Sequence, residues 1–172
     1  VTALDRLSGR AVWTYQPPEL KHSVNPARNN PGGRALSFAT AQSVAVNGDV
    51  VAAVVGHASP MGRLIPGIYH LTKLVCLSSK DGKLRWRLSP NQIDETLANG
   101  YFHGTPIIRD GCVFVLLGRG QLQGFYSAYI AAVNVRTGQL LWRRHLQSSP
   151  IQRSQAAPSY ARMIYHEGKL FA

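Results

Sequence analysis

The sequence predicts an all-β chain, a partial β-propeller of four-stranded antiparallel blades, from two repeating observations. A motif with a glycine and a tryptophan at fixed positions occurs in three copies that align without gaps. Between the copies, a hairpin signal made of two apolar runs around a glycine-containing turn also recurs. Four-stranded units repeated along a chain, with a periodic glycine and aromatic residue, are the pattern of a β-propeller.

The motif begins with a small residue. Its third residue is Asp, Asn or Ser, its seventh is Gly and its eleventh is Trp. Its copies occupy residues 3–13, 76–86 and 132–142, and they hold all three tryptophans of the chain. The middle copy is looser, because it begins on a cysteine and has a serine at the third position. Each copy predicts two strands joined by a tight turn at its glycine, and we expect Asp5 and Asn134 to hydrogen-bond to that turn.

The hairpin signals are centred on Gly48, Gly111 and Gly168. Asn-Gly or Asp-Gly between apolar runs is the strongest short-range hairpin signal, because a type I′ turn needs a positive φ at both central residues. We therefore expect β-hairpins at these positions, and not helices.

Together the two signals predict whole units of four strands in the middle of the chain and half units at its ends. The expected strands of the whole units are 42–46, 50–56, 71–79 and 83–88, then 105–109, 112–117, 129–136 and 139–146. The expected organisation is a single partial propeller over residues 1–172, with a half blade at 1–16, a blade at 41–89, a blade at 104–146 and a half blade at 160–172. A propeller of about seven or eight such blades needs on the order of 420 to 480 residues. We therefore expect an open arc that packs against the remaining blades of the same propeller.

Arginines alternate with apolar residues in the last strand of the whole units. Charged side chains on an edge strand discourage pairing with another molecule, and we expect this role here. A stripe that binds a partner is the alternative. The arginines concerned are Arg85, Arg87, Arg143 and Arg144.

The composition indicates a folded, basic domain. Of the 172 residues 45% are hydrophobic, which suffices for a core and excludes a disordered tail. The formal charge of +11 comes from 19 Lys and Arg against 8 Asp and Glu, although only 16% of the residues are charged. The arginines are spread over strands and loops with no basic stripe interleaved with aromatics, so nucleic acid is not favoured as a partner.

The two cysteines, Cys76 and Cys112, each lie in an apolar run. We expect both to be small buried residues, and they indicate neither a disulfide scaffold nor a zinc site. No apolar run is long enough for a membrane-spanning helix, and no signal peptide is visible in this chain.

The long connections are all expected at one end of the blades, at 16–39, 56–70, 89–104, 118–128 and 147–159. Loops on a rigid scaffold often carry binding residues. This end would form a mildly positive, aromatic rim suited to a protein partner or to a small anionic or carbohydrate ligand, with an ordinary solvated surface as the alternative. Its residues are Lys21, Arg28, Arg34, Arg63, Arg119, Arg153, Glu19, Asp94, Glu95, His22, His57, His70, His103, Tyr69, Tyr101, Phe102, Phe125 and Tyr126.

No residue pattern in the chain points to catalysis or to a metal. The histidines lack metal-ligand spacing, and the glycine-rich stretches lack the Lys-Ser/Thr of a phosphate-binding loop. No Gly-x-Ser-x-Gly motif occurs. The sequence therefore predicts no catalytic residue, no metal ligand and no evident cofactor.

The repeated motif resembles the tryptophan-docking motif of the quinoprotein-type (PQQ-like) β-propellers. That family includes dehydrogenases that use pyrroloquinoline quinone (PQQ) and non-enzymatic relatives such as the outer-membrane-assembly lipoprotein. The resemblance implies that each tryptophan packs on the small residue and the glycine turn of an adjoining blade. The blade-docking residues are then Ala3, Asp5, Gly9, Trp13, Cys76, Gly82, Trp86, Ala132, Asn134, Gly138 and Trp142.

Two functions follow from the resemblance. The first is a non-catalytic protein-binding or assembly scaffold, which fits a repeat made of packing motifs. The alternative is an arc of a PQQ-dependent alcohol or sugar dehydrogenase, whose active site lies in other blades. For such an enzyme the resemblance implies a vicinal Cys-Cys pair and a calcium site, and this stretch contains neither, so PQQ and calcium would belong only to a complete propeller. The resemblance also implies a periplasmic or secreted bacterial protein.

Overall fold

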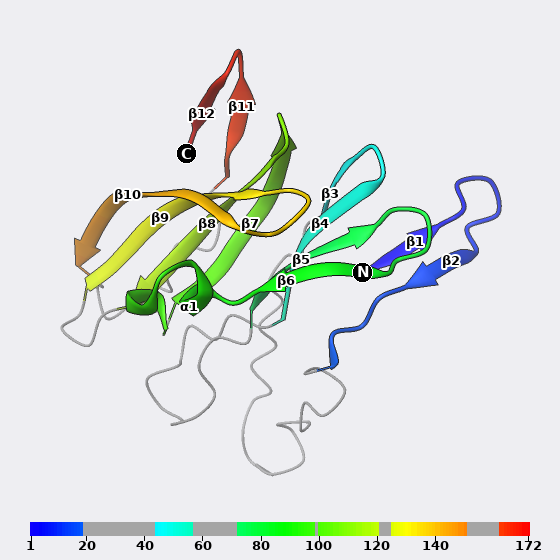
Figure 1. Cartoon of the computed structure of the whole chain (residues 1–172), viewed down its shortest axis with the longest axis horizontal. Coiled ribbons are helices and arrows are strands. Elements are labelled where there is room, and N and C mark those ends of the chain that lie inside the picture. Colours follow the sequence, from blue (N-terminus) through cyan, green and yellow to red (C-terminus); the bar gives the residue numbers. More distant parts are fainter. Residues whose placement is uncertain (19–43, 57–71, 99, 121–124, 151–161) are drawn as a thin grey trace, which may run out of the picture.

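The structure is a computed structural model that describes residues 1–18, 44–56, 72–98, 100–120, 125–150 and 162–172. Its strands form two four-stranded antiparallel sheets, with a separate two-stranded hairpin near each end of the chain (Figure 1). Each strand pairs with its neighbour in the chain, so each sheet is a meander. The chain is an all-β partial propeller.

The strands fall into four groups along the chain, which we name by their order. The first half blade consists of β1 (Thr2–Leu4) and β2 (Ala11–Thr14). The second blade consists of β3 (Val44–Asn47), β4 (Val50–Val55), β5 (Lys73–Ser78) and β6 (Leu84–Leu88). The third blade consists of β7 (Gly100–Arg109), β8 (Cys112–Gly120), β9 (Phe125–Asn134) and β10 (Leu140–Pro150). The last half blade consists of β11 (Ile164–His166) and β12 (Lys169–Phe171).

The turns of the three hairpins differ in type. Asp110 and Gly111 have φ values of 50° and 74°, so both central residues of that turn have the positive φ expected of type I′. Glu167 and Gly168 repeat this, with φ values of 47° and 74°. In the second blade, by contrast, Asn47 pairs with Val50, and Gly48 is the first central residue instead of the second.

The strands of the third blade are longer than the sequence predicts. The segment 118–128, expected as a long loop, is mostly strand, since β8 continues to Gly120 and β9 begins at Phe125. Gly118 lies within β8, beside the ring of Tyr126. A Cβ at Gly118 would lie 2.8 Å from Tyr126 Cε2. At the other edge β10 extends to Pro150, into the segment expected as the last long loop.

The segment at 89–104 was also expected as a loop, and it contains two short helices. These are α1 (Pro90–Ile93) and the 3-10 helix η3 (Glu95–Leu97). The backbone N–H of Ser89 donates to Gln92 Oε1 at 2.8 Å where α1 begins. Ile93 and Leu97 are buried in the core that the second and third blades share, so this segment contributes to packing between blades.

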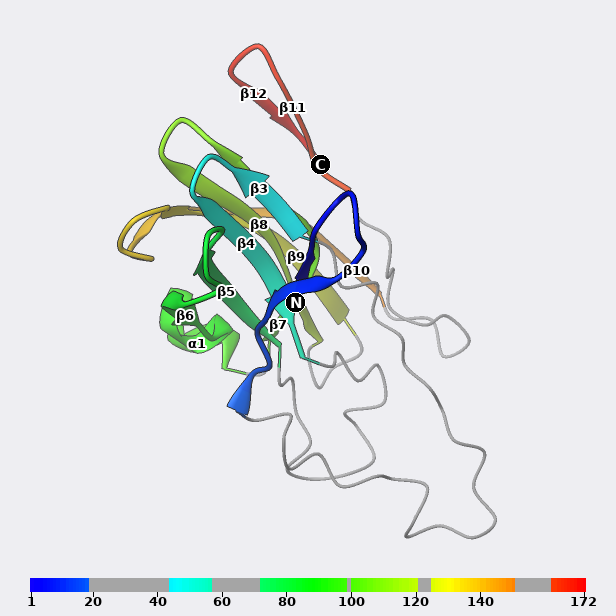
Figure 2. The ribbon, with the colours of Figure 1, turned by 90° about the vertical axis from the view of Figure 1, so that its right-hand side faces the viewer.

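The apolar core lies between blades, on both faces of the second blade (Figure 2). Side chains alternate between the faces of a strand, and all six residues of β4 are buried. Val50, Ala52 and Val54 belong to the core shared with the third blade. Val51, Ala53 and Val55 belong to a second core. Trp13 and Tyr15 pack against this second core.

The two cysteines are free thiols, but they differ in burial. Cys76 is fully buried, as expected. Cys112 is only half-buried, which corrects the expectation, because it is the first residue of β8 and lies next to the turn. Among the described residues, no helix has both the length and the apolar character needed to cross a membrane.

Candidate functional site

The first contact between blades joins Trp13 of β2 to the turn between β5 and β6. The ring of Trp13 lies against Gly82, where a Cβ would be only 2.6 Å from the ring. The indole Nε1 donates to the Ser79 carbonyl at 2.9 Å. Gly82 has a φ of +69°, a conformation that L side chains rarely adopt. Both the backbone conformation and the close approach of the ring therefore require glycine at this turn.

The second contact repeats this geometry one blade further along the chain. The ring of Trp86 lies against Gly138, where a Cβ would be 2.8 Å from the ring, and its Nε1 donates to the Val135 carbonyl at 2.9 Å. The thiol of Cys76 lies 3.6 Å from the same carbonyl. Burial raises the pKa of Cys76 to about 11. In both contacts, the carbonyl that accepts the indole N–H belongs to the residue three positions before the glycine.

Side chains at the third motif position organise the turns. Asp5 Oδ1 accepts the backbone N–H groups of Leu7 at 3.2 Å and Ser8 at 2.8 Å. Asn134 Oδ1 likewise accepts the backbone N–H groups of Arg136 at 2.9 Å and Thr137 at 3.1 Å. The hydroxyl of Ser8 and the backbone N–H groups hold the pKa of Asp5 below its ordinary value. Asp5 and Asn134 thus have polar partners within their own turns.

The middle copy has Ser78 at the third position, and Asp81 inside its turn takes the place of Ser8 and Thr137 in the other copies. Each of these three side chains accepts the backbone N–H of the residue two positions after it. The backbone N–H of Lys83 donates to Asp81 Oδ1 at 3.3 Å, and Lys83 Nζ lies 3.1 Å from Oδ2. Hydrogen bonds from Ser78 and Lys83 lower the pKa of Asp81 to about 2.

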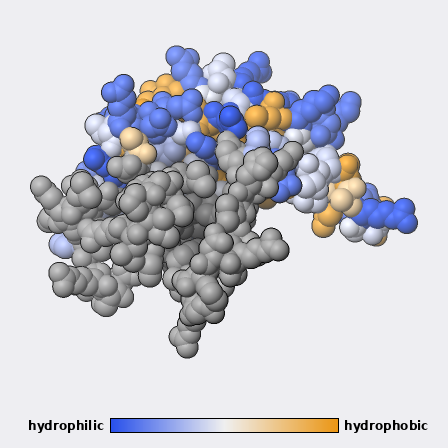
Figure 3. Space-filling model, turned by 90° about the horizontal axis from the view of Figure 1, so that it is seen from below, coloured by the Kyte–Doolittle hydropathy of each residue, from blue (hydrophilic) through white to orange (hydrophobic). Residues whose placement is uncertain are grey.

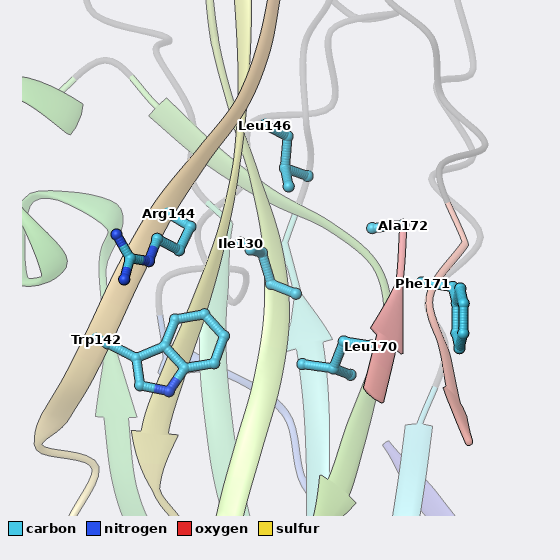
Figure 4. A pocket seen from close by; sticks show the side chains of 7 residues that line it. All are labelled: Ile130, Trp142, Arg144, Leu146, Leu170, Phe171 and Ala172. Atoms are coloured by element: carbon cyan, nitrogen blue, oxygen red, sulfur yellow. The ribbon is translucent and has the colours of Figure 1, made fainter. Parts of the chain in front are cut away.

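Trp142, in the third copy of the motif, has a different environment. No turn glycine that the structure describes has this ring against it. Its side chain is 39% exposed, and its ring centroid lies 5.9 Å from that of Phe114. A hollow of about 480 Å³ opens beside it, between the outer strands of the third blade and β12 (Figure 4). The residues that line this hollow are Ile130, Trp142, Arg144, Leu146, Leu170, Phe171 and Ala172.

Most of the rim residues predicted at the ends of the blades lie outside the described residues. These are Lys21, Arg28, Arg34, Arg63, Arg153, Glu19, His22, His57, His70 and Tyr69. Asp94, Glu95, Tyr101, Phe102, His103, Arg119 and Tyr126 are described, and Phe125 begins β9. Phe102 is a core residue with 1% exposure, so it does not belong to a binding rim. Among the described residues, no three His, Cys, Asp or Glu side chains lie close enough to hold a metal ion.

The structure brings three predicted rim residues together as an aromatic cluster, in which Tyr126 is buried and Tyr101 and His103 are half-buried. Tyr126 Oη lies 3.2 Å from His103 Nε2. The ring centroids of Tyr101 and His103 are 5.7 Å apart, and those of Tyr101 and Tyr126 are 6.4 Å apart. Burial lowers the pKa of His103 to about 4 and raises the pKa of both tyrosines. The imidazole is therefore neutral at pH 7, and the cluster packs as an uncharged unit.

Arg85 and Arg143, two of the edge arginines, form ion pairs with aspartates. Arg85 Nη2 lies 2.6 Å from Asp49 Oδ2. Arg143 Nη2 lies 2.8 Å from Asp94 Oδ2, and its guanidinium carbon is 5.2 Å from the centroid of the Tyr129 ring. Asp94 also begins η3 by accepting the Thr96 N–H at 2.8 Å. Arg143 thus fastens the helical segment to the third blade.

The outer edge of the third blade is β10, which runs for 11 residues against 5 for β6 at the same position of the second blade. Most of its side chains are exposed. Its ladder with β9 is interrupted between Leu140 and Trp142 and between His145 and Gln147. In the part of the chain that the structure describes, β9 is the only strand that pairs with β10. The length of this edge strand was not visible in the motif, which ends at Trp142.

The fold and the contacts can be compared with known proteins. Among solved structures, a europium-containing methanol dehydrogenase is similar to this chain, with 15% sequence identity and a TM-score of 0.41. The similarity covers 61% of this chain and 15% of that chain, so the chain spans only a small part of that protein's length. No curated protein matches the chain.

A protein-family model covers the chain from end to end. The family is described as outer membrane protein assembly factor BamB, and its model matches residues 1–172. The structure has the four-stranded antiparallel sheets that the resemblance to PQQ-like propellers predicts. The chain therefore belongs to the PQQ-like propeller family described as outer membrane protein assembly factor BamB.

Proposed function

We propose that this chain is a non-catalytic scaffold that binds another protein, in the assembly of the bacterial outer membrane. The description of its family as an assembly factor supports this function. It also supports a place at the periplasmic side of that membrane. The observation that carries the proposal is the long outer edge of the third blade, held rigid by the contacts between blades.

Rigidity comes from the way in which the blades are fixed to one another. Trp86 connects β6 of the second blade to the turn between β9 and β10 through its ring and its indole N–H. On the same side, Arg143 of β10 is fixed by Asp94 and Tyr129. A binding edge that is already ordered loses little conformational entropy when a partner binds.

The edge itself suits an extended partner segment. An edge strand presents unpaired backbone N–H and C=O groups, to which a peptide can add as a further strand. Along the 11 residues of β10, alternate residues present their N–H and C=O groups outward for such pairing, and Pro150 has no N–H. The basic character of the chain, with a formal charge of +11, favours an acidic segment. A protein-binding propeller that uses this edge needs neither quinone nor calcium.

Site-specific photo-crosslinking in cells tests the proposal. A photoreactive phenylalanine analogue replaces Gln147 on β10 and, as the matched control, Arg87 on β6, the shorter outer edge of the second blade. We expect one protein adduct from position 147 and none from position 87, and the purified adduct partner should bind the wild-type chain in solution. Titration with PQQ and calcium should give no dye-linked oxidation of alcohols or sugars. Such an oxidation, or the absence of a specific adduct from position 147, contradicts the proposal.

A further inference from the structure

We infer that the side of the molecule formed by the short turns docks on a membrane surface rich in anionic lipid headgroups. This docking uses no residue of β10, so the inference goes beyond the proposed function and does not depend on it. The turns that take part belong to all four groups of strands. We call them the turn surface, and it consists of residues 5–10, 47–50, 79–83, 109–112, 135–139 and 166–169.

The turns of each blade lie at the same end of its sheet because the sheet is an antiparallel meander. In such a sheet, the turn after the first strand and the turn after the third strand are at the same end. Figure 1 shows the short turns at the upper and right-hand ends of their strands. The turns of neighbouring blades therefore face solvent on one side of the molecule.

Hydrogen bonds hold the turns of the complete blades together. In the second blade the Ser79 N–H donates to the Asp49 carbonyl at 3.0 Å. In the third blade the Val135 N–H donates to the Gly111 carbonyl at 2.9 Å. The Val135 carbonyl also accepts the indole N–H of Trp86 from the second blade at 2.9 Å. The turn surface is thus ordered before it meets a partner, which reduces the conformational entropy lost on binding.

Each carboxylate of the turn surface has a partner nearby. Asp5 accepts hydrogen bonds within its own turn, and Asp110 accepts the hydroxyl of Tyr165. The other three each lie within 3.8 Å of a nitrogen on a basic or histidine side chain, and they are Asp49, Asp81 and Glu167. The negative charges of this surface are therefore compensated locally.

Most cations of the turn surface lack such compensation. Six of its Lys and Arg side chains are exposed and form no ion pair with any residue that the structure describes. They occur in both half blades and both complete blades, and they are Arg6, Arg10, Lys80, Arg109, Arg136 and Lys169. The turn surface therefore presents an excess of positive charge to solvent over its whole extent.

An apolar side chain lies among these cations at the first turn. Leu7 is 85% exposed, and Arg6 and Arg10 flank it in the chain. Lys80 and Arg136 occupy the same motif position in the complete blades and are exposed too, so exposure belongs to this position of the turn. An apolar side chain with cations beside it can enter the boundary between headgroups and acyl chains while the cations meet the phosphates.

These features favour lipid over other anionic partners. Proteins that bind single-stranded nucleic acid combine cations with aromatic side chains on which the bases stack. The six turns contain no Phe, Tyr or Trp. An acidic protein segment accounts for the cations alone, whereas the headgroup boundary of a bilayer accounts for Leu7 as well.

The position of a charge decides how much it contributes to docking. Each Lys or Arg beside an anionic bilayer raises binding about fivefold at physiological salt. This effect falls off within a Debye length of about 8 Å. The chain as a whole carries a formal charge of +11, and its described surface seen from below is also largely hydrophilic (Figure 3). A variant of equal net charge is therefore the control for any loss of binding.

Co-sedimentation of the purified chain with lipid vesicles tests the inference. In about 0.15 M salt the wild-type chain should bind phosphatidylcholine vesicles that contain about 30% phosphatidylglycerol, and it should not bind vesicles of phosphatidylcholine alone. The triple variant Arg6→Gln, Arg10→Gln, Arg136→Gln should bind the anionic vesicles on the order of 100-fold more weakly, since it lacks three cations of the turn surface.

The matched control is the triple variant Arg87→Gln, Arg144→Gln, Arg162→Gln. These three side chains are exposed and lie outside the turns, and their replacement lowers the net charge equally. The control should bind the anionic vesicles within about threefold of the wild-type chain, because its altered positions do not meet the bilayer. A loss as large as that of the first variant overturns the inference, since binding then depends on net charge and not on the turn surface.

Leu7→Ser separates a lipid surface from an acidic protein surface. It should weaken binding to the anionic vesicles about tenfold, because the side chain no longer enters the apolar boundary. Far-UV circular dichroism should show the same β content for all variants. An unchanged affinity of Leu7→Ser overturns the inference in favour of an acidic protein partner. A wild-type chain that does not bind the anionic vesicles also overturns it, as does a first triple variant that binds like the wild type. None of these outcomes affects crosslinking from position 147, so the two proposals fail separately.

Discussion

Replacing Trp86 with alanine measures how strongly one tryptophan fastens two blades together. Trp86 is 9% exposed, lies against Gly138 and donates to the Val135 carbonyl at 2.9 Å. Truncating a buried aromatic side chain to alanine costs about 3–5 kcal/mol, because the lost transfer free energy adds to that of the cavity. The variant also leaves the Val135 carbonyl with only the weak thiol donor of Cys76 at 3.6 Å. We expect the free energy of unfolding to fall by about 4 kcal/mol.

Trp142→Ala is the matched comparison, because Trp142 occupies the same motif position but is 39% exposed. On a side chain of roughly 250 Å², the difference from Trp86 is about 75 Å² of surface. At about 25 cal/mol per Å² this amounts to about 2 kcal/mol. Trp142→Ala should therefore destabilise the fold by about 2 kcal/mol less than Trp86→Ala.

Urea unfolding followed by far-UV circular dichroism measures both losses. The slope of free energy against urea should stay unchanged, since the fold is the same. Equal losses for the two tryptophans, or a loss below about 1 kcal/mol for Trp86→Ala, would refute the idea that these rings fasten neighbouring blades.

Three further outcomes follow from particular residues. Gly82→Ala should lower the midpoint of urea unfolding more than Gly48→Ala, because both positions have positive φ but only Gly82 has the Trp13 ring within 2.6 Å of a Cβ. Burial lowers the pKa of His103 from 6.5 to about 4 in the folded chain. Below pH 6.5 the unfolded chain therefore binds a proton that the folded chain does not, so the free energy of unfolding should fall as the pH drops from 6.5 toward 4. His103→Gln should flatten that part of the stability profile, and an NMR titration should show no protonation of the wild-type imidazole between pH 5.5 and 7.5. Burial raises the pKa of Cys76 to about 11, so its thiol should resist alkylation at pH 8 in the folded chain and react quickly in urea.

Much of the fold was predictable because it repeats. The glycine and tryptophan motif specifies a turn, and the turn specifies two strands, so three copies locate three strand pairs by comparison alone. The hairpin glycines add the remaining strand pairs in the same way. Asp5 and Asn134 could be identified as turn residues because a carboxylate or amide oxygen two residues before backbone N–H groups is a common local arrangement.

Features that occur once in the chain were not predictable. Gly118 suggests a turn when it is considered alone, and only the position of Tyr126 shows that it belongs to a strand. The pairing of Arg143 with Asp94 joins residues that are distant in sequence, and no local pattern records it. The cluster of Tyr101, His103 and Tyr126 had one signal in the sequence. Tyr101 and His103 are two positions apart, so in a strand their rings lie on the same face. That signal does not distinguish a solvated rim from a packed interior.

The three motif copies also show what a repeat leaves undetermined. Each copy encodes its own turn through local hydrogen bonds, but the burial of its tryptophan depends on a glycine turn in the next blade. Trp86 is 9% exposed and Trp142 is 39% exposed, although both follow the same motif. The motif therefore specifies its turn by itself, whereas the stability that its tryptophan contributes depends on the contacts of the ring. Comparing Trp86→Ala with Trp142→Ala measures that dependence.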